Sequence, residues 1–228
     1  MLKLGIPSKG RLQQKTLDWF AARGVTLQLT GAEREYAGEV PGFSDLQLVL
    51  LSASEIPREL AAGRIQLGVT GQDLVAEYPQ SGLELEQLAE LGFGHADLVV
   101  AVPKVWIDVD TMDDLDAVAA AFRARHGFRL RVATKYHDLT RLFFRDNGVA
   151  DYQIVDSQGA TEGTVKNLTA EIIADITSSG ETLSANHLKI LSDGLILKSQ
   201  ATLFTAGKSG WSGSEAATFA ALIAKLGL

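Results

Sequence analysis

The chain has 228 residues, a formal net charge of −7, four histidines and no cysteine. The absence of cysteine excludes disulfides, thiolate catalysis and cysteine-based zinc sites, and no two histidines have metal-ligand spacing. The acidic balance argues against nucleic-acid binding, and no apolar run suits a signal peptide or a membrane span, so we expect a soluble cytoplasmic protein.

Strand and helix signals alternate along the chain. Apolar runs of strand length predict strands at residues 2–7, 45–52, 65–71, 95–103, 129–135, 151–157 and 172–176. Amphipathic or capped segments predict helices at 8–24, 53–64, 72–78, 109–127, 136–148, 163–172, 182–188 and 212–228. This alternation is typical of an α/β fold with largely parallel strands.

Local signals refine three of these segments. Thr111 followed by Asp114 has the spacing of a capping box. Pro57 falls in a first helical turn, where a missing N–H costs nothing. The sequence of residues 188–205 predicts two extended segments, one on either side of the turn-like Ser192–Gly194.

Small or charged residues follow most predicted strands, for example in "PSKGR", "VTGQD", "ATKYH" and "ITSSGET". In open parallel sheets, ligands bind at the carboxyl ends of the strands. We therefore expect a binding site assembled from these junctions.

The stretch "DITSSGETL", residues 175–183, carries the strongest functional signal. Backbone N–H groups at the start of the following helix, with the hydroxyls around them, would suit an anion. Asp175 would repel a bare phosphate but could accept hydrogen bonds from sugar hydroxyls, so a sugar phosphate fits better. An ordinary helix start capped by Ser or Thr is an equally frequent explanation of such a stretch.

Residues 159–183, "GATEGTVKNLTAEIIADITSSGETL", align without a gap to a pattern that begins G-S-x-E and ends T-G-x-T-L. On this stretch the chain resembles the ATP phosphoribosyltransferase family, which catalyses the first step of histidine biosynthesis. Further similar segments, such as "GIPSKGRL", "VATKYHDLTRLFF" and "KSQATLF", cover nearly the whole chain in the family's order.

The resemblance implies a reaction in which N1 of ATP attacks C1 of phosphoribosyl pyrophosphate and pyrophosphate leaves, with Mg²⁺ carried on the pyrophosphate rather than by a protein metal site. It implies catalytic roles for Arg34, Glu162 and Asp175. The phosphoribosyl pyrophosphate site would comprise Asp175, Thr177, Ser178, Ser179, Gly180, Glu181 and Thr182. The ATP site would comprise Lys9, Gly10, Arg11, Arg34, Gly71 and Asp73.

Simpler explanations exist for the predicted ATP site. Lys9 and Arg11 fit a solvated basic turn, Arg34 fits a surface arginine paired with a neighbouring glutamate, and Asp73 fits a helix N-cap. Many relatives also have an arginine where this chain has Ser52. Arg58 or Lys166 could replace that arginine.

By the same resemblance we expect a two-lobed, periplasmic-binding-protein-like (type II) α/β fold with a central cleft. One lobe would comprise residues 1–97 and 185–228, and the other residues 98–184. The chain resembles the short form of the family, which implies a homodimer core in a hetero-oligomer with a regulatory subunit similar to histidyl-tRNA synthetase. A solute-binding module and a phosphoribosyltransferase for another base remain alternatives.

Overall fold

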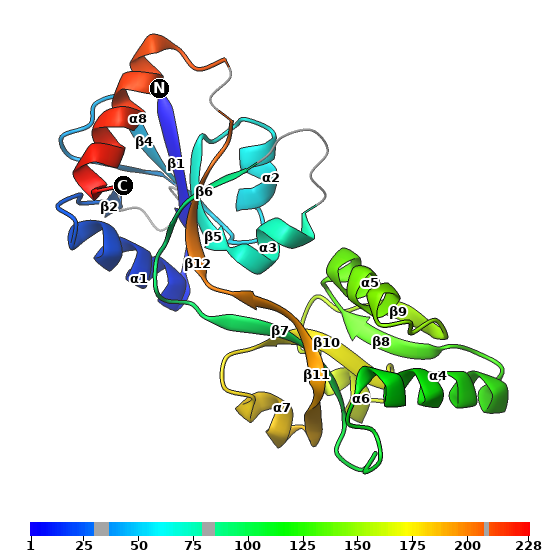
Figure 1. The fold of residues 1–228 in the computed structure, drawn as a ribbon. Helices are drawn as coiled ribbons and strands as arrows, with labels where there is room; N and C mark the ends of the chain where they lie inside the picture. Colours follow the sequence, from blue (N-terminus) through cyan, green and yellow to red (C-terminus); the bar gives the residue numbers. More distant parts are fainter. Residues whose placement is uncertain (30–36, 79–84, 208–209) are drawn as a thin grey trace. The chain divides into compact units, whose positions relative to one another are not determined.

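The computed structural model describes residues 1–29, 37–78, 85–207 and 210–228. It divides into two compact units, one formed by Met1–Gly94 with Gln200–Leu228 and the other by His95–Ser199 (Figure 1). Residues 185–199, assigned from the sequence to the first lobe, lie in the second unit, because strand β11 (Leu188–Ser199) pairs along strand β7 (Ala96–Pro103) of that unit.

In the first unit, the described residues form one seven-stranded sheet in the order β2-β3-β4-β1-β5-β12-β6. The three central strands β4, β1 and β5 are parallel, and β3 and β12 run antiparallel to their neighbours in this group. The strands are β1 (Leu2–Pro7), β2 (Gln28–Leu29), β3 (Ala37–Glu39), β4 (Leu46–Leu51), β5 (Leu67–Gly71), β6 (Glu86–Glu90) and β12 (Ala201–Thr205).

Helices cover both faces of this sheet because its strands carry apolar side chains on both sides. Side chains of α1 (Gly10–Ala21) and α8 (Gly213–Leu226) share one core with Leu2, Leu4 and Ile6 of β1. Side chains of α2 (Ile56–Ala61) and α3 (Gln72–Glu77) form a second core with Phe204 of β12. Pro57 lies at the start of α2, as predicted.

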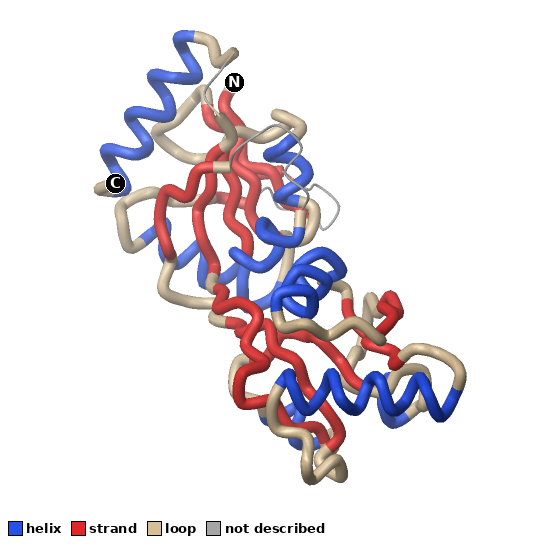
Figure 2. The backbone as a smooth tube through the Cα atoms, turned by 45° about the vertical axis from the view of Figure 1, so that its right-hand side comes forward, coloured by secondary structure: helices blue, strands red, loops and turns tan. Residues whose placement is uncertain are grey.

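The second unit contains a five-stranded sheet in the order β11-β7-β10-β8-β9. Strands β10 (Ile172–Thr177), β8 (Leu130–Thr134) and β9 (Tyr152–Asp156) are parallel, whereas β7 is antiparallel to β10 and to β11. Figure 2 shows the strands of each unit lying alongside one another with helices flanking them.

Alternate side chains of β10 enter two separate cores. Ile172 and Ala174 pack in the core that contains residues of α4 (Met112–His126) and α5 (His137–Asp146). Ile173 packs instead with Leu183 of α7 (Glu181–Ala185), next to Val165 of α6 (Gly163–Lys166). Because successive side chains in a strand point to opposite faces, Asp175 lies on the α6–α7 side of the sheet.

Residues 188–199 form one strand, so the predicted break at Ser192–Gly194 is wrong. The pairing of β11 with β7 shifts register between Ile190 and Leu195, and this irregularity accommodates the turn-like residues without ending the strand. A Cβ on Gly194 would lie 3.1 Å from the carbonyl oxygen of Val100, so glycine allows the close approach of the two strands.

Three strands of the first unit, β2, β3 and β6, were not predicted. Strand β6 reads "EQLAE" and has no buried residue, and both residues of β2 are exposed. Such short polar strands have no apolar alternation, and only their pairing with neighbouring strands defines them. In the part of the chain that the structure describes, no helix is long and apolar enough to cross a membrane.

The predicted capping box at the start of α4 is confirmed. The N–H of Asp114 donates to Thr111 Oγ1 at 3.2 Å, and the N–H of Thr111 donates to the Asp114 carboxylate at 2.9 Å.

Loss of such a cap costs about 1 kcal/mol, so Thr111→Ala should lower the free energy of unfolding by that amount. Urea unfolding measures the change. Thr111→Ser, which keeps the hydroxyl, should stay close to the native value, and an equal loss in both variants would contradict a role for the cap.

Candidate functional site

A pocket of about 360 Å³ lies in the second unit, beside β10 and α7. Its walls bring together six of the residues predicted to bind phosphoribosyl pyrophosphate or act on it: Glu162, Asp175, Thr177, Ser178, Ser179 and Thr182. His95 and Ala96, which precede and begin β7, also line it. Two acidic groups and a loop rich in hydroxyls therefore line one cavity.

The loop after β10 is folded by its own side chains. Thr177 Oγ1 accepts a hydrogen bond from the N–H of Gly180 at 2.8 Å, which closes a tight turn. Gly180 has φ +75°, a left-handed conformation that favours glycine. Among the described residues, the N–H groups of Ser178 and Ser179 donate no hydrogen bond, and both residues are exposed. These two N–H groups and the serine hydroxyls are donors available to an anion.

The helix that follows this loop contributes little to the site as a dipole. Helix α7 has five residues, so its partial charge at the N-terminus is small. The cap residue is Gly180, which has no side chain, and the N–H of Glu181 at the helix start donates a long hydrogen bond to Ser179 Oγ at 3.4 Å. Anion binding here would depend on the turn and its hydroxyls.

Asp175 lies in β10, two residues before the strand ends, and pairs with Val99 of β7. Burial raises the pKa of its carboxyl group above the ordinary value, and the nearby carboxylate of Glu162 acts in the same direction. The N–H of Ile176, which donates to Asp175 Oδ1 at 2.9 Å, opposes this shift, as do the charge of Lys135 and the hydroxyl of Thr161. A carboxylate with this environment retains capacity to accept hydrogen bonds from a ligand.

Sequence reasoning missed three residues near this carboxylate. His95 lines the pocket, and the charge of Lys135 and the hydroxyl of Thr161 lower the pKa of Asp175. Lys135 follows β8 in the junction "ATKYH", and β8 is the parallel neighbour of β10. Lys135 could have been predicted from the expectation that ligands bind at the carboxyl ends of strands. No sequence signal marked His95 or Thr161.

The predicted ATP residues of the first unit lie at one edge of its sheet. Strands β4, β1 and β5 are parallel neighbours, and Pro7 at the end of β1 pairs with Leu51 at the end of β4. Lys9 and Arg11 follow β1 and are exposed, and Gly10 between them has φ +77°. Gly71 ends β5 and caps α3, so Asp73 is not the N-cap but a buried residue of the first turn.

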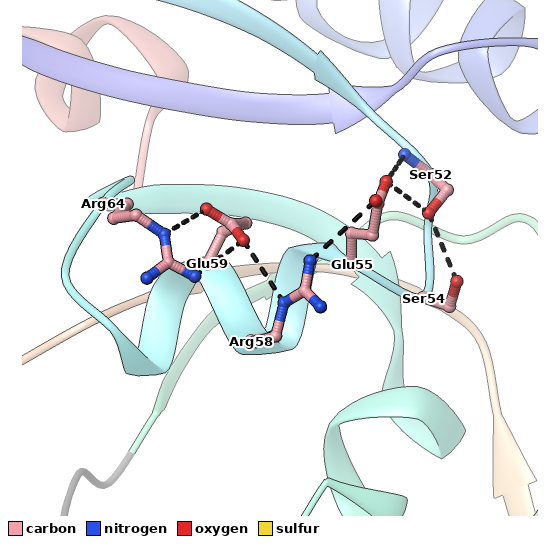
Figure 3. A network of polar contacts seen from close by, with 6 residues as sticks. All are labelled: Ser52, Ser54, Glu55, Arg58, Glu59 and Arg64. Carbon is pink, nitrogen blue, oxygen red and sulfur yellow. Dashed lines mark hydrogen bonds and ion pairs between the residues drawn. The ribbon is translucent and has the colours of Figure 1, made fainter.

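Ser52 belongs to a network of polar contacts at the start of α2 (Figure 3). Its N–H and hydroxyl both donate to the carboxylate of Glu55, at 3.0 and 2.6 Å. Arg58 lies 3.9 Å from Glu55 and 3.4 Å from Glu59, and Arg64 also pairs with Glu59. Arg58 is thus held by two glutamates.

Two further predicted residues, Glu181 and Lys166, do not line the pocket. Arg34 lies outside the described residues. Glu181 begins α7 and Lys166 ends α6, and both are exposed. In the part of the chain that the structure describes, no three His, Asp or Glu side chains gather as a metal site.

Comparison with known proteins identifies the family. The family model described as HisG: ATP phosphoribosyltransferase matches residues 52–226. The chain belongs to the ATP phosphoribosyltransferase family. This confirms the resemblance found in the sequence, and members of this family generally require a divalent metal ion.

Two bacterial relatives share this assignment over nearly their full lengths. An ATP phosphoribosyltransferase of Cereibacter sphaeroides is 69% identical over 228 residues, which cover 100% of this chain and 96% of that protein. One of Mesorhizobium japonicum is 52% identical over 218 residues, which cover 95% of this chain and 94% of that protein. The chain is therefore a phosphoribosyltransferase and not a solute-binding module.

Solved structures confirm the predicted fold class. A chain of the ATP phosphoribosyl transferase (HisG:HisZ) complex from Thermotoga maritima matches with a TM-score of 0.74 at 23% identity, over 100% of this chain and 97% of that chain. The periplasmic aliphatic sulphonate binding protein SsuA from Escherichia coli matches with a TM-score of 0.55 at 16% identity, over 99% of this chain and 70% of that chain. The ATP phosphoribosyltransferase fold of this chain is thus periplasmic-binding-protein-like.

The turn at Gly180 yields a prediction on the shape of the site. Gly180→Ala places a Cβ on a left-handed residue, which should cost about 1–2 kcal/mol of the free energy of unfolding or force the loop into another conformation. Urea unfolding measures the loss. Gly163→Ala is the matched control, because Gly163 lies in α6 with open space around it and no positive φ. Equal stability of the two variants would contradict the strained turn.

Proposed function

We propose that the pocket in the second unit binds the phosphoribosyl group of phosphoribosyl pyrophosphate, and that the chain transfers this group to N1 of ATP. The observation that carries the proposal is the position of a half-buried carboxylate, Asp175, beside a turn with unpaired N–H groups and with serine and threonine hydroxyls. A phosphate alone would avoid Asp175, whereas a ribose 5′-phosphate offers hydroxyls to the acid and an anion to the loop.

In the proposed binding mode, residues Thr177–Thr182 hold the 5′-phosphate. Asp175, with Glu162 on the same pocket wall, accepts hydrogen bonds from the ribose hydroxyls. Two carboxylates near the ribose also favour positive charge at C1. Such a charge develops as the bond from C1 to the pyrophosphate oxygen breaks, so these residues would stabilise the transition state.

The bonding changes follow from the substrates. The lone pair of adenine N1 forms the new bond to C1, and the pyrophosphate leaves with the electron pair of the broken C–O bond. The products are phosphoribosyl-ATP and pyrophosphate. No side chain has to remove a proton before the attack, and proton loss from the product can be left to water.

We assign ATP to the strand-end edge of the first unit. Lys9, Gly10, Arg11, Gly71 and Asp73 share this edge, and the exposed cations Lys9 and Arg11 suit polyphosphate. Arg34 joins this set as the proposed cation for the leaving pyrophosphate. Arg58, which is paired with Glu55 and Glu59, and Lys166 stay the two candidates for the charge missing at Ser52.

The divalent ion is proposed to be Mg²⁺ carried on pyrophosphate oxygens. The donor set fits this, because the pocket offers two carboxylates and the described residues form no group of three metal ligands. When bound, the ion would neutralise charge on the leaving pyrophosphate. Cytoplasmic histidine biosynthesis is the expected setting.

We further propose a partner. The similar Thermotoga maritima structure is a HisG:HisZ complex. By analogy, a homodimer of this chain would assemble with a regulatory subunit similar to histidyl-tRNA synthetase.

A turnover assay tests the reaction. The purified chain, with the regulatory subunit added, should form phosphoribosyl-ATP from ATP, Mg²⁺ and phosphoribosyl pyrophosphate, followed by its absorbance. Parallel reactions with other purine bases should give no product. Absence of turnover with ATP, or faster turnover with another base, would overturn the proposal.

The role of Asp175 has its own test. Asp175→Asn removes the charge that accepts the ribose hydroxyls, so kcat/KM for phosphoribosyl pyrophosphate should fall about 100-fold, as expected for two charge-assisted hydrogen bonds. The Kd of ATP should change less than about two-fold, since ATP meets other residues. Asp146→Asn, an exposed carboxylate of the same unit that pairs with Arg145, is the control. Equal weakening of both substrates by Asp175→Asn would refute the assignment.

A further inference from the structure

His95 lies immediately before strand β7, at the pocket of the second unit. Strand β10 ends at Thr177, which pairs with Asp97 of the antiparallel strand β7. The same register carried two residues further brings His95 level with Ser179 of the loop that follows β10. Both residues line the pocket, so the strand register and the cavity agree in placing His95 beside the turn with unpaired N–H groups.

The alternation of side chains along β7 puts His95 on the same face of the sheet as Asp175. Val99 pairs with Asp175 and packs in the core on the α6–α7 side, whereas Val100 packs in the core on the other side. Because successive side chains of a strand point to opposite faces, Asp97 and His95 follow Val99 on the α6–α7 side. The side chain of His95 is exposed, so its imidazole is open to a ligand.

His95 differs in charge from the other residues of the pocket. Among the described residues that line it, Glu162 and Asp175 are acids, and His95 is the only one that can carry a positive charge. Asp97, which pairs with Thr177, adds a further carboxylate at the same end of β10. A phosphate monoester carries about 1.5 to 2 negative charges near neutral pH. In this acidic surrounding, a protonated imidazole would offset the repulsion that a phosphate meets.

We propose that His95 binds the 5′-phosphate of the phosphoribosyl substrate: its imidazolium donates a hydrogen bond to a phosphate oxygen, alongside the N–H groups of Ser178 and Ser179. The inference rests on the proposed function of the pocket. The 5′-phosphate is not attached to C1, where bonds form and break, so this contact is the same before and during the reaction. His95 therefore strengthens binding of phosphoribosyl pyrophosphate and leaves the chemical step unchanged.

Other ionisable groups on neighbouring elements must be separated from the effect of His95. They are Asp97 of β7, Lys198 of β11, Asp175 of β10, Glu162 before α6, Glu181 of α7 and Lys135 after β8. All of them are present both in the native chain and in a variant of His95, so the difference between the two reports on His95. The phosphate itself titrates near about pH 6, and this contribution cancels in the same way.

The first test measures KM and kcat with the regulatory subunit added, at about pH 6 and about pH 8, because histidine changes its charge in this range. His95→Asn keeps a polar side chain without the charge. The KM for phosphoribosyl pyrophosphate should therefore rise about ten-fold at the lower pH, where the native imidazole is charged. The rise should be smaller at the higher pH, where the native chain has lost that charge as well.

The same variant distinguishes the 5′-phosphate from the leaving pyrophosphate. For a 5′-phosphate contact, kcat and the KM for ATP should stay within about two-fold of the native values. His95→Lys, whose charge persists at both pH values, should restore a low KM at both. A large fall in kcat, or an equal rise in KM at both pH values, would overturn the proposal.

His126→Asn provides a matched control in the same unit. His126 is exposed and ends α4, which packs on the other face of the sheet, and its ring lies 4.3 Å from that of Phe122. Its replacement removes a histidine far from the pocket, so the KM should stay native at both pH values. A change equal to that of His95→Asn would reduce the effect to the net charge of the protein and refute a specific contact.

A measurement without turnover separates this inference from the proposed function. The ring resonance of His95 is titrated with pH by NMR, once with ribose 5-phosphate and once with unphosphorylated ribose. Ribose 5-phosphate should move the midpoint of His95 about one unit upward, because an anion stabilises the imidazolium, and should leave that of His126 unchanged. An unmoved midpoint overturns the role of His95, even if the chain turns over. A moved midpoint in a chain that forms no phosphoribosyl-ATP supports the phosphate contact and refutes only the reaction.

Discussion

The half-buried carboxylate of Asp175 is the physical constraint on which the candidate site depends. Desolvation disfavours its charged form, and the site contains three groups that oppose this: the Ile176 N–H, the Lys135 ammonium and the Thr161 hydroxyl. These groups come from β10, the junction after β8 and the segment before α6, so only the folded sheet assembles them. The carboxylate can then be both desolvated and available for hydrogen bonds.

The loop beside Asp175 supplies hydrogen-bond donors. Its turn is closed by Thr177 and Gly180, which leaves the N–H groups of Ser178 and Ser179 without partners among the described residues, while Ser179 Oγ accepts from the N–H of Glu181. Carboxylates that accept hydrogen bonds and loop groups that donate them thereby line one pocket of about 360 Å³. A ligand that is half polyol and half anion matches this arrangement, which together with the family is the basis for proposing a phosphoribosyl donor.

Sequence reasoning predicted the elements that carry strong local signals. The α4 capping box at Thr111 and Asp114 and the first-turn Pro57 depend on residues a few positions apart, and both are confirmed. Errors arose where partners are distant in the chain. The Ser192–Gly194 segment looks like a turn, yet pairing with β7 keeps it in one strand, and β6 has no signal besides its pairing with β12.

The sequence by itself determined the family, the α/β class and the loop of residues 175–183, because each is written in consecutive residues with specific spacing. It also placed Glu162 and Asp175 among the candidates, and both line one pocket. Only the tertiary structure brought His95, Lys135 and Thr161 to Asp175, and held Arg58 between two glutamates. The physical reason is that desolvation and charge act through space, so side chains 13 to 40 positions away in the chain affect the pKa of Asp175.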